Sequence, residues 1–394
     1  MKIALYSDTF APKIDGVANT VKNSARALGE MGHEVRVYVV SEKNGVELTK
    51  QANGLYTVIT IPSVSIPVYP GVRFSLPFGF TLFNLRKFRP DVVHVHTPFA
   101  VGIEGVVGAK IFGIPLVGTH HTFFDYYLKH IYLDYNWAKK FSWRITVAFY
   151  NRVDLVISPT KSLRDELTSN GLYKQVGVLS NSIDFQVFRN DKKLNLSRLE
   201  LKKKFGISGK SIVYMGRVSY EKNIDDVVLA TAQLVKKIPD IKLMIVGDGP
   251  EKEKLITMSK NLKIEKNVIF TGFLHNESLV KALSANEVFV TASRSENMPL
   301  AVLEAESLGL PVVAISSLGM CEIVDDNVNG FLLPQGDKEK IVSNIADAIL
   351  KFMTDDALLE KFSNNSKKLS EKYSEKEITK KLVEIYKQII NTKP

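Results

Sequence analysis

Short apolar, β-rich runs alternate with amphipathic segments along the whole chain. In the first half, the apolar runs predict strands at residues 2–7, 34–40, 91–95, 115–119 and 154–158. Helical periodicity fills the segments 20–31, 100–112 and 162–169 between them. Continuous apolar strands separated by helices are typical of a parallel sheet that is covered on both faces.

The same alternation starts again after a polar, lysine-rich stretch at 190–209. Further strands are predicted at 211–215, 242–246, 267–271, 288–291 and 311–315. A chain of 394 residues is too long for one ordinary core. We therefore predict an α/β protein with two Rossmann-like domains, 1–189 and 190–373, that face a central cleft. An amphipathic tail, 374–394, is expected to form a helix that crosses back to the first domain.

Charge and cysteine content limit the possible partners and surroundings. Fifty-two basic residues against 42 acidic ones give a net charge of +10, which suits nucleic acid, a nucleotide or an acidic lipid surface, or reflects only solvated faces. The single cysteine, Cys321, excludes an internal disulfide and a cysteine-based zinc site, so a reducing cytoplasm fits. No apolar run approaches the ~20 residues that span a bilayer, and the first residues lack a signal-peptide pattern.

The segment 295–304 places two carboxylates around a predicted helix start. A strand ends near Thr291, a polar loop follows, and Pro299 stands where a first helical turn tolerates proline. The loop and the helix N-terminus offer N–H groups to an anion. Glu296 and Glu304 could then bind separate hydroxyl groups of the same ligand. Helix capping and a solvated face are the alternative explanation.

Two basic residues follow the first strand of the second half. Arg217 and Lys222, just after Gly216, form a candidate diphosphate clamp, because arginine offers a bidentate fork and lysine a point charge. An exposed basic turn paired with Glu221 is the alternative. In the turn after the very first strand, Gly16 would let the backbone approach a phosphate at a helix start.

Four of the seven histidines fall at the carboxyl ends of two predicted strands, where α/β domains bind ligands. They are His94, His96, His120 and His121. No His-Glu-x-x-His or comparable spacing accompanies them, so no metal site is predicted. A single buried histidine is usually structural, but the clustering indicates that one of the four meets a substrate.

The stretch 123–152 is dense in aromatic and basic residues and holds both tryptophans. This mixture suits a helix lying at a membrane surface, where each Lys or Arg near anionic lipid contributes roughly 1 kcal/mol. An apolar loop at 63–80 could enter the membrane beside it. The alternative is that the aromatic residues belong to the core. The candidates for membrane or acceptor contact here are Tyr126, Trp137, Lys139, Lys140 and Arg144.

Taken together, these residues resemble the retaining glycosyltransferases of family 4, which have the two-Rossmann GT-B architecture. The resemblance covers nearly the whole chain and rests on Gly16-Val17, on 91–96, on Gly216-Arg217 with Lys222, on 246–250, on the Glu-x7-Glu pair and on 306–313. Within the family the chain looks closest to bacterial diacylglycerol glucosyltransferases. The residues that carry this resemblance are 7–12, 15–17, 69–70, 121–122 and 126–127.

The resemblance implies a role for each matching residue. Glu304 would hold the ribose hydroxyls, and Arg217 and Lys222 would hold the diphosphate. Glu296 would bind the donor hexose together with the backbone of Asn297, Met298, Pro299 and Leu300. Gly16 would approach the phosphate or sugar from the first domain. The predicted catalytic residues are His121, Glu296, Arg217 and Lys222, with His120 as the alternative to His121.

Two positions depart from the family pattern. Asp15 stands where many members have glycine, so this carboxylate, with His120, is assigned to the acceptor side. Ser182 replaces a usual glycine, which weakens any inference about its loop.

The resemblance implies transfer of a hexose, with glucose from UDP-glucose favoured over galactose or glucuronic acid, to diacylglycerol with retention of the α configuration. It implies no tightly bound cofactor, no metal for donor binding (stimulation by Mg²⁺ stays open), no nucleic acid, and a peripheral place on the cytoplasmic face of the membrane. Two alternatives stay open. One is a family 4 enzyme acting on a phosphoinositol, a polyprenyl-linked sugar or a soluble sugar; the other is a basic nucleotide- or nucleic-acid-binding module.

Overall fold

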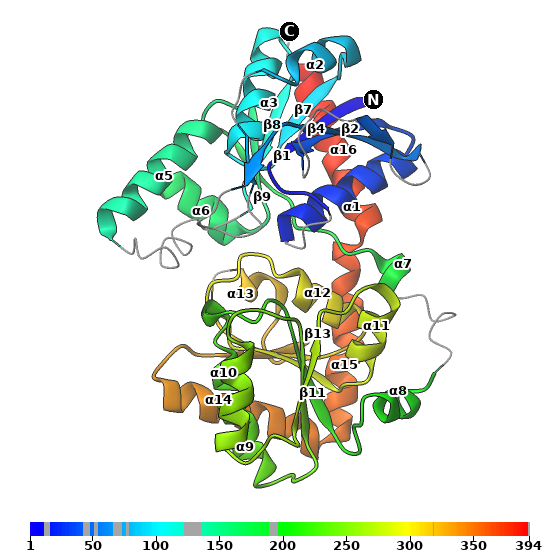
Figure 1. Ribbon diagram of the computed structural model, residues 1–394, viewed down its shortest axis with the longest axis vertical. Helices are drawn as coiled ribbons and strands as arrows, with labels where there is room; N and C mark the ends of the chain where they lie inside the picture. Colours follow the sequence, from blue (N-terminus) through cyan, green and yellow to red (C-terminus); the bar gives the residue numbers. More distant parts are fainter. Residues whose placement is uncertain are drawn as a thin grey trace. The chain divides into compact units, whose positions relative to one another are not determined.

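The structure, a computed structural model, describes residues 1–11, 16–41, 48–50, 54–65, 73–75, 79–121, 135–188, 196–317 and 319–392. The chain divides into two compact units, each built around its own sheet (Figure 1). The first unit consists of 1–182 with 375–394, and the second of 183–374. The sequence placed these two boundaries after 189 and after 373.

An eight-stranded sheet forms the centre of the first unit. Its order is β10 (Val176–Val178), β9 (Leu155–Ser158), β8 (Leu116–Thr119), β7 (Val92–Val95), β1 (Lys2–Ser7), β2 (Glu34–Val40), β4 (Tyr56–Ile61) and β3 (Leu48–Lys50). All neighbours pair in parallel except β3, which pairs antiparallel with β4. The five strands predicted for this half are confirmed. Periodicity missed β3, β4 and β10, as well as the short pair β5 (Val64–Ser65) and β6 (Arg73–Phe74) inside the predicted loop.

Helices cover both faces of this sheet. They are α1 (Gly16–Glu30), α2 (Leu82–Phe88), α3 (Ala100–Ile111), α5 (Asn136–Tyr150), α6 (Lys161–Ser169) and α16 (Glu375–Thr392). The connection β1–α1–β2 runs across the sheet in one direction, whereas β7–α3–β8 and β8–α5–β9 run in the other. Because parallel crossovers are right-handed, α1 lies on one face while α3 and α5 lie on the opposite face.

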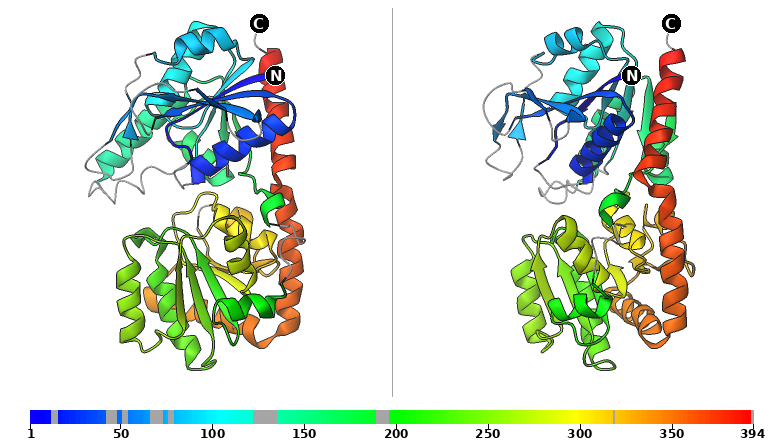
Figure 2. Two further views of the ribbon diagram at one scale, coloured as in Figure 1. Left: turned by 45° about the vertical axis from the view of Figure 1, so that its right-hand side comes forward. Right: turned by 90° about the vertical axis from the view of Figure 1, so that its right-hand side faces the viewer.

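The tail helix α16 completes the face that carries α1. Tyr386 is fully buried, and it shares a core with Leu5 and Val21 of the first strand and helix. At the start of α16, Glu375 accepts a hydrogen bond from Arg26 of α1 at 2.6 Å. The prediction that the tail helix returns to the first unit is therefore confirmed; α16 is the red helix in Figure 2.

The second unit has a six-stranded, all-parallel sheet. Its order is β13 (Val268–Gly272), β12 (Lys242–Val246), β11 (Ser211–Met215), β14 (Val288–Thr291), β15 (Val312–Ile315) and β16 (Gly330–Leu333). Along β11, Ile212 and Tyr214 enter one hydrophobic cluster and Val213 enters the other. Side chains alternate between the two faces of a strand, so the sheet is buried on both sides, as its continuous apolar strands predict.

The helices of the second unit pack on these two faces. They are α7 (Phe185–Phe188), α8 (Arg198–Lys204), α9 (Ile224–Val235), α10 (Lys252–Asn261), α11 (Asn276–Ser284), α12 (Leu300–Ser307), α13 (Met320–Ile323), α14 (Lys338–Thr354) and α15 (Asp356–Ser370), with the 3-10 turns η3 (Tyr220–Lys222) and η4 (Glu371–Tyr373).

The polar stretch 190–209 does more than connect the two halves. Its described part contains α8, which begins with a capping box in which the Glu200 carboxylate accepts from the Ser197 N–H at 2.6 Å. Leu201 and Ile207 are buried in the core of the second unit. The lysine-rich composition of this stretch hid these two buried residues, which belong to the core of the second unit.

Candidate functional site

The second unit has its topological switch point between β11 and β14. From β11 the chain continues to β12 on one side, while β14 pairs with β11 on the other. Ligands of open α/β sheets bind in the crevice at such a point, beyond the carboxyl ends of the strands. The loop after β11 carries Arg217 and Lys222, and the loop after β14 carries Glu296. Topology thus brings together residues that lie about 75 positions apart in the sequence.

Lys222 and Glu296 form an ion pair across this switch point. The Lys222 Nζ donates to the Glu296 Oε1 at 2.6 Å, and each side chain is about one-fifth exposed. Lys222 ends η3, and the following Asn223 is left-handed, with φ 48°, and donates to the carbonyl of Ala292 at 3.4 Å. The sequence assigned Lys222 to the diphosphate and Glu296 to the hexose, and raised Glu221 as a structural partner. The direct pair with Glu296 was not foreseen.

Arg217 lies on the same loop as Lys222 but is exposed to solvent. Its guanidinium makes no hydrogen bond or ion pair with any residue that the structure describes. Its carbonyl accepts from the buried Tyr214 hydroxyl at 3.1 Å, which fixes the backbone. The loop is therefore held in place while the guanidinium stays available to an anion.

The glycines at 246–250 pack against this loop. Gly247 has φ 144°, and a Cβ there would lie 1.9 Å from the Gly216 carbonyl oxygen. Next to it, the Val218 N–H donates to the Asp248 carbonyl at 3.0 Å. Only glycine lets the two loop backbones come this close. The motif therefore supports the loop that carries Arg217.

The two nearby glutamates of α12 have different environments. Glu304 is partly buried; burial raises the pKa of its carboxyl to about 8, and this carboxylate accepts no hydrogen bond from the described residues. Glu306 is fully buried, burial raises its pKa well above the usual value, and it accepts from the Asn329 amide at 2.8 Å. Glu306 is thus part of the core, whereas the Glu304 oxygens accept no hydrogen bond from the residues that the structure describes.

The start of α12 offers backbone rather than side chains. Asn297 and Met298 are both buried, with Met298 in the hydrophobic core. Pro299 is the N-cap and Leu300 the first helical residue. The Val302 N–H donates to the Pro299 carbonyl at 3.2 Å, whereas the first two N–H groups of a helix have no acceptor within it and suit an anion. A ligand at this helix start would therefore meet peptide groups.

In the first unit the switch point lies between β1 and β7. Asp8, the acidic residue at this point, was not among the predicted site residues. Asp8 follows β1 and accepts from the Thr97 hydroxyl at 2.6 Å and from the Val101 and Gly102 N–H groups at 2.9 and 3.4 Å. Burial raises the pKa of Asp8 to about 6. The start of α3 is therefore already capped by a protein carboxyl group. An acid directly after a strand was the signal that could have revealed it.

The histidines form a connected group beside this point. His96 Nδ1 lies 3.0 Å from His121 Nε2, and His96 itself is buried. His94 contacts the Tyr386 hydroxyl of α16 at 2.6 Å through Nδ1 and the Thr119 hydroxyl at 2.7 Å through Nε2. Burial lowers the pKa of His94 to about 3 and that of His96 well below its usual value, so both stay neutral.

The two adjacent histidines differ in exposure. His120 is 1% exposed, and its ring lies 5.0 Å from the Tyr150 ring and 6.2 Å from the Trp143 ring. Burial lowers its pKa to about 3. His121 is partly exposed and is held by His96. The geometry favours His121 as the histidine that meets a substrate, and it does not favour the acceptor role assigned to His120.

The remaining first-unit candidates are described only in part. Gly16 begins α1 and is exposed, and a Cβ there would meet no atom within 4 Å. Open space at a helix start leaves room for a phosphate or sugar. Asp15 and Tyr126 lie outside the described residues.

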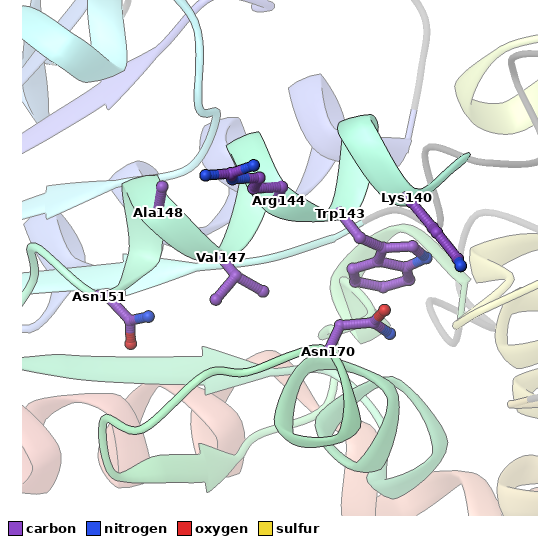
Figure 3. A pocket seen from close by; sticks show the side chains of 7 residues that line it. All are labelled: Lys140, Trp143, Arg144, Val147, Ala148, Asn151 and Asn170. Carbon is purple, nitrogen blue, oxygen red and sulfur yellow. The ribbon is translucent and has the colours of Figure 1, made fainter. Parts of the chain in front are cut away.

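Helix α5 presents a mixed surface. Trp137 is 64% exposed, Lys140 and Arg144 are exposed and Lys139 is half-buried, whereas the second tryptophan, Trp143, is buried. A cavity of about 300 Å³ lies along the helix and is lined by Lys140, Trp143, Arg144, Val147, Ala148, Asn151 and Asn170. Figure 3 shows Trp143, Val147 and Asn151 on the side toward Asn170, with Arg144 on the other side of the helix. The core alternative is confirmed for Trp143, whereas Trp137 is exposed, and membrane contact through it stays a prediction.

No group of three or more histidine, cysteine or acidic side chains in the described part of the chain has the arrangement of a metal site. Among these residues no helix is long and apolar enough to cross a bilayer.

Comparison with known proteins identifies the family. Residues 14–187 match the family described as Glycosyltransferase Family 4, and 197–369 match Glycosyl transferases group 1. The alpha-monoglucosyldiacylglycerol synthase of Acholeplasma laidlawii is 30% identical over 315 residues, which cover 77% of this chain and 78% of that protein. The chain belongs to glycosyltransferase family 4. It is thus an enzyme, a hexosyltransferase, as the sequence motifs implied.

Other relatives of this family 4 glycosyltransferase agree on the fold and differ in substrate. The synthase of the same name from Streptococcus pneumoniae is 29% identical, covering 77% of this chain and 69% of that protein. Mannosyltransferases and a sulfoquinovosyl transferase match as well. The structure of the Anabaena protein HepE in complex with UDP-glucose superimposes with a TM-score of 0.76 at 18% identity, covering 98% of this chain and all of that one. The predicted GT-B fold class is confirmed.

Proposed function

We propose that this family 4 glycosyltransferase transfers glucose from UDP-glucose to diacylglycerol and produces an α-glucosyl-diacylglycerol. The observation that carries the donor half is the Lys222–Glu296 ion pair at the switch point of the second unit, with Arg217 on the same loop and Glu304 on the following helix. The acceptor half is supported by the two glucosyldiacylglycerol synthases that are 29–30% identical.

The site residues divide the donor between them. The Glu304 carboxylate accepts from the ribose hydroxyls, and the cations of Arg217 and Lys222 neutralise the diphosphate. Glu296 and the first-turn N–H groups of α12 bind the hexose. Because Lys222 pairs with Glu296, the donor competes with Glu296 for this cation. The phosphate takes Lys222, and the released Glu296 oxygen accepts from a sugar hydroxyl.

The bond that breaks joins the anomeric carbon to the β-phosphate oxygen. Negative charge develops on this oxygen, and the fixed cations with the helix N-terminus stabilise it. We assign no nucleophilic carboxylate to the protein. The acceptor hydroxyl attacks from the face that the phosphate leaves, the departing phosphate helps to remove its proton, and the α configuration is retained. We assign His121, which is held by His96, to the reacting sugar. In this scheme the side chains alone neutralise the charge of the diphosphate. Turnover is therefore expected to be retained in EDTA, and comparing it with turnover in Mg²⁺ tests this expectation.

The acceptor comes from a membrane. We assign the exposed Trp137, Lys140 and Arg144 of α5, with Lys139, to an anionic lipid surface, because apolar and basic side chains on one helix suit the interface between headgroups and acyl chains. The enzyme is then a peripheral protein of the cytoplasmic face.

One screen tests this function. Purified protein is incubated with radiolabelled UDP-glucose, UDP-galactose, UDP-glucuronic acid or GDP-mannose and with diacylglycerol vesicles, and the lipid product and its anomeric configuration are identified. UDP-glucose is expected to give an α-glucosyl lipid. If the label enters only a phosphoinositol, a polyprenyl-linked sugar or a soluble sugar, that compound and not diacylglycerol is the acceptor. The absence of any sugar transfer, together with steeply salt-dependent nucleic-acid binding, would favour the binding module.

Paired variants test the site. Lys222→Ala and Glu304→Ala are each expected to lower kcat/KM by about 10²–10³-fold, the usual effect of removing one group that stabilises developing charge or positions the donor. The matched controls are Lys281→Ala and Glu277→Ala, which break an exposed ion pair in α11 and are expected to leave turnover unchanged. Wild-type turnover in Lys222→Ala would refute the site.

A further inference from the structure

Helix α3 has an unusual distribution of side chains. Of its 12 residues only Glu104 and Lys110 are charged, and no other is polar. Three glycines lie on the side that packs on the unit, together with Val101 and Val106. A Cβ on Gly105 would lie 2.8 Å from the Tyr6 ring, and one on Gly108 would lie 2.6 Å from Leu85. The two isoleucines of the helix lie instead on the outer side, whereas a helix on a water-exposed surface normally turns its largest apolar side chains inward.

The outer side of α3 is an exposed apolar stripe. Phe99, Ile103, Val107 and Ile111 follow one another at intervals of four residues, one helical turn, and are 48%, 38%, 43% and 60% exposed. Such a stripe on a soluble surface marks a site of contact with another molecule.

Helix α2 extends the stripe. It packs against α3, because Leu85 is the residue that a Cβ on Gly108 would strike. Phe83 of α2 is 80% exposed, and Phe80, just before the helix, is 40% exposed. We call the outer surface formed by these two helices the α2–α3 face; its apolar members are Phe80, Phe83, Phe99, Ile103, Val107 and Ile111.

The exposed charges on α2 and α3 themselves all have one sign. Arg86, Lys87 and Lys110 are exposed and make no ion pair with the described residues. Helices α2 and α3 contain one acidic residue, Glu104, and it is only 2% exposed. Its carboxylate accepts hydrogen bonds from the N–H groups of residues 79–81 at 2.9–3.1 Å. The helix on the opposite face of the sheet, α16, instead carries three glutamates among its lysines.

Helix α5 continues the same layer. It lies on the same face of the sheet as α3, and a Cβ on Gly102 of α3 would be 3.3 Å from Phe149 of α5. Its own exposed stripe is Trp137, Phe141 and Ile145, again four residues apart, and its sequence holds cations and no acid. Figure 1 shows α2 and α3 in blue to cyan and α5 in green in the first unit.

We propose that the α2–α3 face docks on an anionic lipid bilayer, so that the whole helical layer α2–α3–α5, and not α5 alone, is the membrane contact. An apolar centre with a basic margin satisfies acyl chains and phosphate headgroups without requiring a specific pattern of partners. A second copy is disfavoured, because a two-fold interface would place this face against itself and bring cations against cations. The proposal deepens the lipid-directed function proposed above, since it defines the plane on which the acceptor arrives.

The test uses the full chain and vesicles of neutral phosphatidylcholine with or without about one-third phosphatidylglycerol. The variant combines Ile103→Ser, Val107→Ser and Ile111→Ser. The matched control changes three exposed apolar residues elsewhere, Val178→Ser, Leu199→Ser and Val328→Ser. In co-sedimentation the wild type and the control are expected to bind anionic vesicles, and the face variant to bind at least tenfold more weakly. Lys87→Glu with Lys110→Glu should weaken binding about fivefold for each cation removed.

Two further measurements separate the possible outcomes. The denaturant-unfolding transition followed by tryptophan fluorescence should be unchanged in the face variant; both tryptophans lie in the first unit, so this shows that the altered unit is folded. Unchanged vesicle binding in the face variant would overturn the proposal. A wild-type dimer in sedimentation velocity that becomes a monomer in this variant would overturn it as well, and would assign the face to a second copy. If vesicle binding is lost as expected but no protein makes a glycolipid, the face stands and the proposed acceptor fails.

Discussion

Replacing Glu304 by glutamine gives a test of the donor site that depends on pH. Burial raises the pKa of the Glu304 carboxyl to about 8. At neutral pH most molecules therefore carry a protonated side chain at this position. A ribose hydroxyl donates its hydrogen bond best to the ionised form, so only that minor fraction of the protein is ready to bind the nucleotide.

The size of the effect follows from this pKa. If only the ionised form binds, the apparent Kd equals the intrinsic Kd multiplied by 1 + 10^(pKa − pH). With a pKa of about 8, this factor falls from about 11 at pH 7 to about 1.3 at pH 8.5, so binding strengthens about eightfold. The sign is fixed: affinity rises as pH rises through the pKa of the free site. The nucleotide phosphate, with a second pKa near 6, contributes little in this range.

Isothermal titration calorimetry with UDP at several pH values measures this directly. The wild type is expected to show the eightfold change, and Glu304→Gln, which cannot titrate, is expected to show a flat profile. A flat wild-type profile, or the same slope in both proteins, would refute the assignment of Glu304 to the ribose. An affinity that falls with rising pH would mean that the protonated carboxyl donates the hydrogen bond instead.

Two predictions concern what holds each unit together. Tyr386→Phe leaves a buried nitrogen of His94 without its partner and is expected to lower the free energy of unfolding by about 1–3 kcal/mol. Both tryptophans lie in the first unit, so their fluorescence during denaturant unfolding measures this, and the exposed Tyr220→Phe serves as control; equal stability of the two variants would contradict the prediction. Gly247→Ala, whose Cβ would clash with a loop carbonyl, should cost about 1–3 kcal/mol or more in scanning calorimetry. Gly336→Ala, where a Cβ meets nothing, should cost little, and a stable Gly247→Ala variant would show that the loops can separate.

Much of the candidate site could be read from local sequence. Carboxyl ends of predicted strands located the loops that hold Lys222, Glu296 and His121, because ligand sites of parallel sheets lie at that edge. The contacts between these side chains could not be read in the same way. Lys222 and Glu296 follow strands that are neighbours in the sheet but distant in the chain, and only the strand order β11–β14 brings them to 2.6 Å.

Burial separated residues that the sequence treats alike. His120 and His121 are adjacent, yet one ring packs between aromatic residues and the other is partly exposed. Glu304 and Glu306 are two positions apart, yet one keeps free acceptor oxygens and the other is bonded inside the core. Consecutive residues point to different sides of a chain, and which side is the interior depends on elements packed from far away.

The alternation of apolar strands and helices determined the two parallel sheets, because a strand that is buried on both faces must be apolar along its length. It also determined the helical tail. Tertiary structure decided that this tail buries Tyr386 against His94 of the first unit. It also decided that α3 turns glycines inward and Ile103, Val107 and Ile111 outward. Apolar periodicity shows that a helix has an apolar face, but the space available beside the sheet decides which face is buried and which is left for another molecule.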